Sequence, residues 1–239
     1  MKISELKDLV DNLENLKIGL DNTFQFSCSR CGRCCYWRDD IMVSPSDVFR
    51  GSKVLGIYPL DFISKYCEIF LGGQSRTPLL RIKSDMRDGH CVLLKNNQCI
   101  IHKGKPTVCA LYPIGRFIEN NHSGDVLQVG YINPGSHCGH DETHSVREWI
   151  ASFGLEEEEE IFKQWSVYQF RFGPMFTDLE NMLSHEEFYD FIVVFVGLVY
   201  ALYDTTKEFL PQLINNCEMA SGMVLSKIVR NRGPFYGGK

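Results

Sequence analysis

Four cysteines lie within eight residues of this chain, in the run Cys28-Ser-Arg-Cys31-Gly-Arg-Cys34-Cys35. The spacing Cys-x2-Cys-x2-Cys-Cys lets several sulfur atoms converge on a small volume, as a bound metal ion or an iron–sulfur cluster requires. The run therefore predicts a metal site. A redox or structural thiol cluster is the alternative interpretation.

Four later cysteines extend this set, and the fold must bring them to the run because they are distant in the chain. A metal that ties residue 28 to residue 138 would close a long loop and stabilise a region with little regular structure. The predicted metal ligands are Cys28, Cys31, Cys34, Cys35, Cys91, Cys99, Cys109 and Cys138. Cys67, between Tyr66 and Phe70, is expected as a small buried hydrophobic residue and is left out of the metal site. Cys217, on the last expected helix, is not a predicted ligand.

The adjacent pair Cys34 and Cys35 is awkward for a single ion, because neighbouring side chains of an extended chain point apart. The pair fits better if the two thiols serve different metals, or if one is not a ligand. A [4Fe–4S] cluster needs four thiolates, and Cys-x2-Cys-x2-Cys is a cluster-like spacing. Zinc needs four ligands per ion, so eight thiols could hold two ions or one binuclear site. An iron–sulfur cluster, of the 4Fe-4S type, is the favoured prediction, with zinc as the alternative.

Around these cysteines the chain resembles the YkgJ-type, or CxxCxxCC, family of zinc- or iron-chelating proteins. The resemblance covers roughly residues 24–140, and its motifs occur in the family's order. The matching elements are Phe26-Ser-Cys28-Ser-Arg-Cys31-Gly-Arg-Cys34-Cys35, Gly89-His-Cys91-Val-Leu-Leu, Asn97-Gln-Cys99-Ile-Ile-His, Lys105-Pro106-Thr-Val-Cys109-Ala-Leu-Tyr112-Pro113 and Cys138-Gly139. Lys105 and Ala110 stand where members often carry arginine.

Three functions stay open. The first is a metal-binding protein with a structural, electron-transferring or accessory role. The second is a cluster-dependent, methyltransferase-like enzyme that modifies a protein with S-adenosylmethionine, since the family resembles the cysteine-rich part of flagellin lysine methylases. The third is a metal chaperone or sensor. The chain has no Gly-x-Gly-x-x-Gly after a strand, no P-loop and no Cys-x3-Cys-x2-Cys spacing, so no catalytic residue is predicted.

Composition narrows the class of protein. Of the 239 residues, 44% are hydrophobic and 23% charged, which is typical of a globular protein, and a net charge of −5 argues against a general nucleic-acid binder. The longest apolar stretch, residues 191–203, is shorter than the roughly 20 residues that span a bilayer. The start of the chain does not read as a signal peptide. We expect a cytoplasmic protein with reduced thiols, without nucleic-acid or membrane partners; a protein partner stays open.

Residues 76–116 are strongly basic, with eight Lys or Arg against two Asp. Three of the later cysteines lie in this segment. Nearby cations lower the pKa of thiols and would offset the charge of bound thiolates. The segment is therefore either a counter-charge for thiolates or a solvated loop surface.

Hydrophobic spacing predicts an α-rich fold, as a single integrated domain over residues 1–239. Residues 24–140 form the cysteine-cluster metal-binding part, with irregular loops and a small β-hairpin, and residues 145–232 form the helical part. Expected helices cover residues 1–20, 45–54, 61–70, 149–153, 155–170, 184–203 and 207–229. Ser44, followed by Pro45 and Asp47, and Ser184, followed by Glu186 and Glu187, are the expected N-caps. Gly154 and Gly173-Pro174 are the expected ends of the helices that precede them. Expected strands cover residues 79–82, 91–94 and 99–101, with a turn at Asn96-Asn97.

Overall fold

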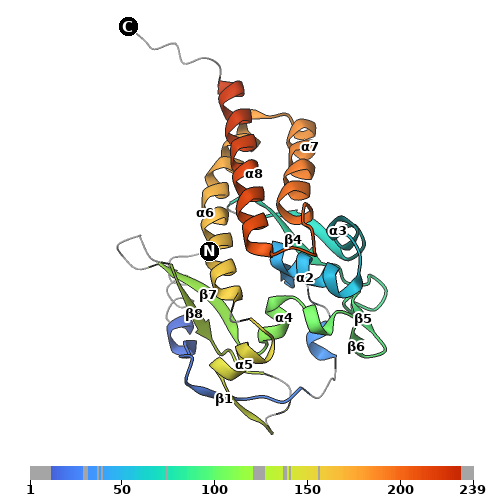
Figure 1. The fold of residues 1–239 in the computed structure, drawn as a ribbon, viewed down its shortest axis with the longest axis vertical. Helices are drawn as coiled ribbons and strands as arrows, with labels where there is room; N and C mark the ends of the chain where they lie inside the picture. The colour runs from blue at the N-terminus through green and yellow to red at the C-terminus, as the bar shows by residue number, and fades with distance from the viewer. Residues whose placement is uncertain are drawn as a thin grey trace. The chain divides into compact units, whose positions relative to one another are not determined.

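The computed structural model describes residues 12–28, 32–36, 38, 40–73, 75–120, 127–136, 139, 141–155 and 157–232. It is helix-rich with several small antiparallel sheets, so the expected α-rich class is confirmed broadly, although the fold is not purely helical (Figure 1). Residues 12–16 are helical, and the rest of the expected N-terminal helix up to residue 11 lies outside the described residues.

The chain divides into two compact units. Unit 1 comprises Met1–Cys34, Asn96–Gln98 and Thr107–Lys163. Unit 2 comprises Cys35–Lys95, Cys99–Pro106 and Gln164–Lys239. The single integrated domain stays a prediction.

Unit 1 contains two antiparallel strand pairs. β1 (Thr23–Gln25) pairs with β9 (Thr143–Ser145), and β7 (Gly115–Asn120) pairs with β8 (Leu127–Ile132). The expectation of irregular loops and one small hairpin in residues 24–140 is wrong for β7 and β8, which pair along their whole length.

The core of unit 1 joins β1 to the short helices α4 (Thr107–Leu111) and α5 (Val146–Ser152). α5 begins at a capping box, in which Ser145 and Glu148 bond each other's backbone N–H. It ends before Gly154, which has a φ of 64°, as the sequence predicted. The buried cluster consists of Phe24, Phe26, Ala110, Leu111, Ile114, Tyr131, Val146, Ile150 and Leu155.

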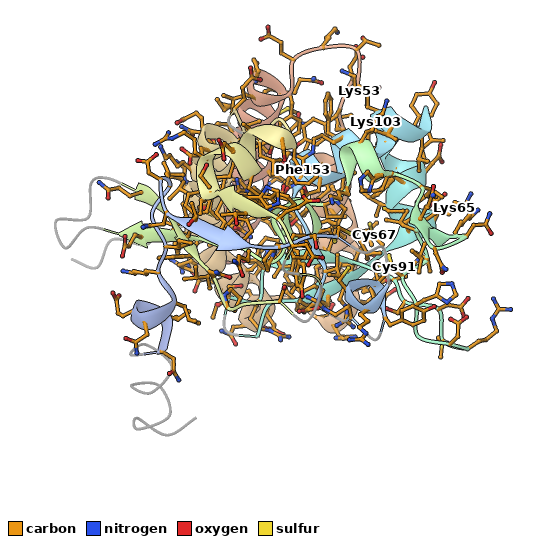
Figure 2. The ribbon with its side chains drawn as sticks, turned by 90° about the horizontal axis from the view of Figure 1, so that it is seen from below. Lys53, Lys65, Cys67, Cys91, Lys103 and Phe153 are labelled. Carbon is orange, nitrogen blue, oxygen red and sulfur yellow. The ribbon has the colours of Figure 1, made fainter. Side chains whose placement is uncertain are left out.

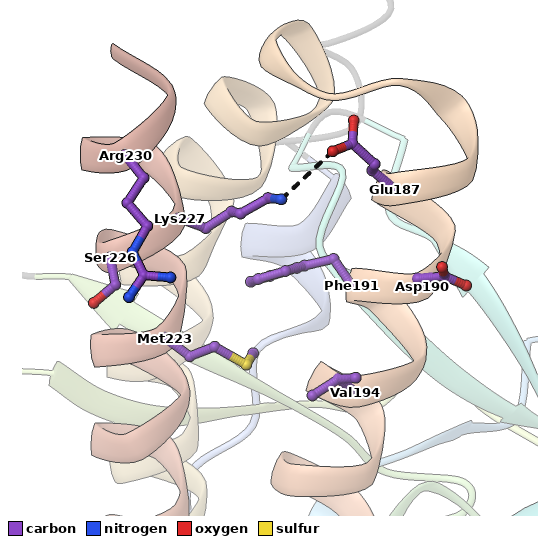
Figure 3. Close-up of a pocket in the computed structure, with 8 residues that line it drawn as sticks. All are labelled: Glu187, Asp190, Phe191, Val194, Met223, Ser226, Lys227 and Arg230. Carbon is purple, nitrogen blue, oxygen red and sulfur yellow. Dashed lines mark ion pairs between the residues drawn. The ribbon is translucent and has the colours of Figure 1, made fainter. Parts of the chain in front are cut away.

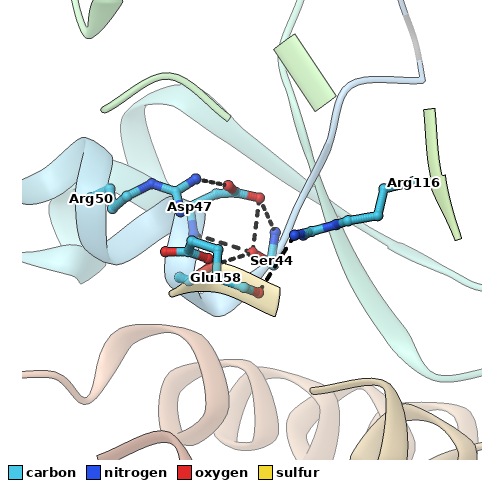
Figure 4. Close-up of polar contacts among 6 residues, drawn as sticks. Ser44, Asp47, Arg50, Arg116 and Glu158 are labelled. Carbon is cyan, nitrogen blue, oxygen red and sulfur yellow. Dashed lines mark hydrogen bonds and ion pairs between the residues drawn. The ribbon is translucent and has the colours of Figure 1, made fainter. Parts of the chain in front are cut away.

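In unit 2, α2 (Pro45–Leu55) begins where the sequence predicted (Figure 4). The Asp47 backbone N–H donates to the Ser44 hydroxyl at 3.2 Å, and the Asp47 carboxylate accepts from the Ser44 N–H at 2.8 Å. Arg50 donates to the other Asp47 oxygen at 2.5 Å. Because Asp47 is only 4% exposed, these contacts compensate for the cost of burying its charge.

A sheet of order β2-β4-β3 follows in unit 2, from β2 (Met42–Val43), β3 (Cys67–Leu71) and β4 (Pro78–Ile82). The expected helix over residues 61–70 is therefore wrong in its second half. α3 (Pro59–Tyr66) ends at Tyr66, and the chain continues as β3, which pairs with β4 along its whole length. Pairing with a strand supplies backbone hydrogen bonds that local helix propensity cannot outweigh.

Three helices complete unit 2: α6 (Glu158–Met182), whose first residues belong to unit 1, α7 (His185–Val196) and α8 (Phe209–Arg232). α7 begins at the predicted Ser184 cap and continues into the π-helix η3 (Gly197–Ala201). α8 matches its prediction within a few residues. The expected end of α6 at Pro174 is wrong, since the helix runs through it. Proline in a helix costs about 3 kcal/mol, and the fully buried Phe172 and Phe176 on either side offset that cost.

Candidate metal centre

In unit 1, Cys28 follows an extended backbone segment that continues from β1. Beyond β1, the Phe26 N–H donates to the Glu142 carbonyl at 2.9 Å, and the Ser27 N–H donates to the Gly139 carbonyl at 2.8 Å. Phe26 is 4% exposed, whereas Cys28 is exposed. A buried aromatic anchor two residues earlier thus fixes the backbone from which this thiol projects.

Gly139 lies against Ser27 so closely that no side chain fits there. A Cβ at Gly139 would lie 2.2 Å from the Ser27 hydroxyl oxygen and 3.0 Å from the Ser27 carbonyl oxygen. The hydroxyl could rotate away, but the carbonyl belongs to the ladder and cannot. Glycine after the late cysteine is therefore a packing requirement of this strand pair.

Cys109 lies on α4, directly before two buried core residues. Ala110 is 3% and Leu111 is 2% exposed, and the Leu111 carbonyl accepts a hydrogen bond from the Trp149 indole N–H at 3.0 Å. The Tyr112 ring meets the Phe26 ring edge-on, with centroids 5.6 Å apart. One aromatic cluster therefore supports both the Cys28 segment and the Cys109 segment.

Cys35 and Cys91 face each other across a backbone ladder in unit 2. The Cys91 N–H donates to the Cys35 carbonyl at 2.7 Å, and Tyr36 forms an antiparallel bridge with His90. In this register Cys35 lies directly opposite Cys91. The register therefore brings the two cysteines opposite each other on neighbouring backbone segments, although they are far apart in the chain.

A second bridge, between Ser84 and Cys91, continues this ladder toward β4. The Val92 N–H donates to the Lys83 carbonyl at 3.2 Å, and the Ser84 hydroxyl donates to the Arg38 carbonyl at 2.9 Å. Cys91 is thus flanked on both sides, by Cys35 and by Ser84, and the Ser84 side chain also contacts the Arg38 segment.

Cys99 lies at the far end of the small hairpin that the sequence predicted. β5 (Leu94–Lys95) and β6 (Gln98–Cys99) form a two-stranded sheet around Asn96 and Asn97. Both asparagines have positive φ, 50° and 60°, as a type I′ turn requires. The strands are shorter than expected, because residues 91–93 belong to the ladder and a turn. The two-residue turn places Cys99 opposite Leu94, whose N–H donates to the Cys91 carbonyl at 2.8 Å.

Cys34 and Cys35 share the short 3₁₀ turn η1 (Arg33–Cys35), but Cys34 ends a segment of unit 1 and Cys35 begins unit 2. Successive side chains of such a turn point about 120° apart. Cys28, Cys34 and Cys109 thus belong to unit 1, whereas Cys35, Cys91 and Cys99 belong to unit 2. The predicted ligands Cys31 and Cys138 lie outside the described residues.

The prediction that Cys67 is a core residue is confirmed, and Cys217 is buried too. They are 4% and 0% exposed, and burial raises the pKa of each thiol to about 12. A smaller rise in the Cys67 pKa comes from the Cys91 thiol, which lies close enough to act on it electrostatically. Cys67 and Cys91 are labelled in Figure 2.

Carboxylates already balance part of the basic segment. Arg76 donates to Glu180 at 2.6 Å, Arg81 to Glu68 at 2.6 Å and Arg87 to Asp85 at 2.8 Å. In unit 1, Arg116 stacks over the Phe162 ring, 3.9 Å from its centroid. These four arginines therefore have structural contacts of their own, which weakens the interpretation of the segment as a counter-charge for thiolates.

The sequence analysis overlooked a second group of donor side chains. Possible ligand atoms of Asp85, Asp88 and His90 lie within 4.8 Å of one another, beside the proposed ligand Cys91. The spacing Asp-x2-Asp-x-His is the signal that could have indicated it. Asp85 is ion-paired with Arg87, whose hydrogen bond holds the pKa of Asp85 well below its usual value, and His90 contacts Asp88. These contacts account for the arrangement without a metal.

Residues 27–128 match the family model CxxCxxCC, described as a "Putative zinc- or iron-chelating domain". The resemblance drawn from the cysteine motifs is confirmed over this range, and the family's description indicates metal binding of the zinc or iron type. Neither the curated proteins nor the solved structures include a significant match to the chain. Within the described residues, no helix combines the length and apolar character that crossing a membrane requires.

Proposed function

We propose that the cysteine set binds an iron–sulfur cluster, in a structural, electron-transferring or accessory role. The observation that best supports this is the pair Cys35 and Cys91, directly opposite on one ladder. Two cysteines held opposite each other by a backbone hydrogen bond are suitable candidates for thiolates that share a metal centre. Around tetrahedral zinc, with Zn–S bonds of about 2.3 Å, sulfur atoms lie about 3.8 Å apart. The thiols therefore fit either metal, and the cluster-like spacing of the first three cysteines favours iron–sulfur.

In this proposal Cys34 and Cys35 serve different ligand groups. Cys35 acts together with Cys91 and Cys99, which share its unit. Cys34 acts with the other cysteines of unit 1: Cys28, Cys31, Cys109 and Cys138. This assignment removes the difficulty of directing two adjacent side chains to a single ion.

When bound, an iron–sulfur cluster supplies one-electron chemistry or a cross-link between chain segments. The residues of the chain contribute the thiolates and hold them in place. Main-chain hydrogen bonds position Cys35 and Cys91, and the aromatic core positions Cys28 and Cys109.

The experiment is purification of the full chain without oxygen, followed by iron, zinc and acid-labile sulfide analysis. We expect iron and sulfide in comparable amounts, with broad absorption near about 400 nm from sulfur-to-iron charge transfer. A colourless protein with stoichiometric zinc and no sulfide would establish zinc and refute the cluster.

Single variants test the ligand groups. Cys35→Ser and Cys91→Ser should each lower the bound metal or change its spectrum. The matched control is Cys217→Ala, which alters a buried cysteine of unit 2 outside the proposed set. Unchanged metal content and spectrum in both serine variants would contradict the role of the ladder pair.

A further inference from the structure

A groove runs between α7 and α8, with a volume of about 500 Å³ (Figure 3). Its apolar lining comes from Phe191 and Val194 on α7 and Met223 on α8. The groove lies on unit 2 and contains none of the cysteines. It is therefore a surface that the proposed metal function does not explain.

Apolar side chains also face solvent on either side of the groove. Val193 and Val194 are 48% and 55% exposed on α7, and Leu225 and Val229 are 48% and 66% exposed on α8. Single exposed apolar residues are ordinary, so it is the groove and its charges that indicate an interaction surface.

The two walls of the groove carry opposite charges. Glu187 and Asp190 lie on the α7 wall, and Lys227 and Arg230 lie on the α8 wall. Glu187 and Lys227 form an ion pair at 3.7 Å, which joins the start of α7 to the end of α8 and shows that the two helices are antiparallel. In Figure 3 the Arg230 side chain extends along α8 toward Ser226, so that its guanidinium lies, along the helix axis, between Lys227 and Met223.

A second copy of the chain can lie on this face with two-fold symmetry in two ways. In one, α7 meets α7 of the second copy, which brings acidic walls together. In the other, α7 meets α8 of the second copy, which brings each acidic wall against a basic wall. Both arrangements make every helix antiparallel to its neighbours, the common geometry of a four-helix bundle. Charge therefore selects the pairing of α7 with α8.

We propose that this face is the interface of a homodimer, in which α7 of each copy packs on α8 of the other. A two-fold interface must be self-complementary, and a groove with one acidic and one basic wall meets that condition. The 12 residues of α7 span about 18 Å, which limits the contact to the small end of stable interfaces. The test therefore covers the micromolar concentration range. The dimer does not depend on bound metal.

The test is sedimentation analysis of the full chain from about 1 to 200 μM, with reductant to prevent intermolecular disulfides, with and without metal. Asp190→Lys and Arg230→Glu each place like charges across the interface and should weaken dimerisation roughly tenfold or more. The double variant Asp190→Lys/Arg230→Glu exchanges the two charges and should restore it. Glu208→Lys, a charge reversal away from the groove, is the matched control and should leave the dimer unchanged.

Circular dichroism and thermal unfolding confirm that each variant is folded. A monomer throughout the concentration range would overturn the proposal and leave the groove for a different partner. A dimer that both single variants leave unchanged would also overturn it, because that dimer would use another surface.

Discussion

The two units present cysteines by different physical means. In unit 1, packed aromatic rings anchor the segments that carry Cys28 and Cys109. In unit 2, a ladder of main-chain hydrogen bonds holds Cys35 opposite Cys91. A packed core resists loss of volume, whereas a ladder resists loss of register, so the units should respond to different substitutions.

The largest effect is expected from Phe26→Ala in unit 1. Phe26 is 4% exposed and packs edge-on against Tyr112 and Trp149, with centroids 5.6 and 5.5 Å away. Removal of a buried phenylalanine ring costs about 3–5 kcal/mol of the free energy of unfolding. Denaturant titration should show this loss, together with reduced metal content. Phe170→Ala, at a 64% exposed phenylalanine, should change neither.

The next largest effect is expected from Gly139→Ala. The added Cβ would lie 3.0 Å from the Ser27 carbonyl oxygen, so the strand pair must separate. Overpacking of this kind costs about 1–3 kcal/mol. Gly73→Ala, at a glycine with open space around it, is the control. Equal stability of the two variants would show that the close contact at Gly139 does not constrain the ladder.

The register of the β5–β6 hairpin, which carries Cys99, is tested at its turn. Asn97→Val places a β-branched residue at a φ of 60° and should lower the free energy of unfolding by about 1–2 kcal/mol. Asn97→Gly suits the same backbone and should be neutral or slightly stabilising. Thermal unfolding and metal content should change together in the valine variant. A glycine variant as unstable as the valine variant would refute the backbone explanation.

The smallest effect is expected at a contact that both units contain, a tyrosine hydroxyl that donates to a glutamate. Tyr131 donates to Glu159 at 2.5 Å in unit 1, and Tyr168 donates to Glu218 at 2.8 Å in unit 2. Tyr131→Phe and Tyr168→Phe should each cost about 1 kcal/mol at neutral pH. A large difference between these two variants would mean that the units differ in more than the presentation of cysteines.

The Tyr168 pair should also give a pH dependence. Burial, with the Glu218 contact, raises the pKa of Tyr168 to about 12, above its unfolded value of about 10. The resulting stability is fully present below pH 10 and is lost as the pH rises toward 12. Denaturant titrations across this range should show a steeper alkaline loss in the parent protein than in Tyr168→Phe.

Local signals in the sequence were sufficient for the helix starts. Ser44 with Pro45 and Asp47, and Ser184 with Glu187, were predicted as caps, and both form capping boxes. A cap involves residues within three positions of each other, so nothing distant can rearrange it. The Asn96-Asn97 turn was predictable for the same reason.

Predictions failed where a distant segment outweighs local preference. Residues 67–71 have a helical pattern, but β4 pairs with them as a strand. Pro174 ends most helices, but buried residues on both sides, Phe172 and Phe176, keep α6 continuous. In both cases the tertiary contacts stabilise the observed structure by more free energy than the local sequence preference costs.

The sequence by itself determined the ligand chemistry: the number of cysteines, their spacing and the resemblance to a zinc- or iron-chelating domain. Only the tertiary structure decided which thiols face each other. Cys34 and Cys35 are neighbours in the chain but belong to different units, whereas Cys35 and Cys91 are distant and directly opposed. The physical reason is that strand pairing between distant segments sets register, and register decides which side chains share a face.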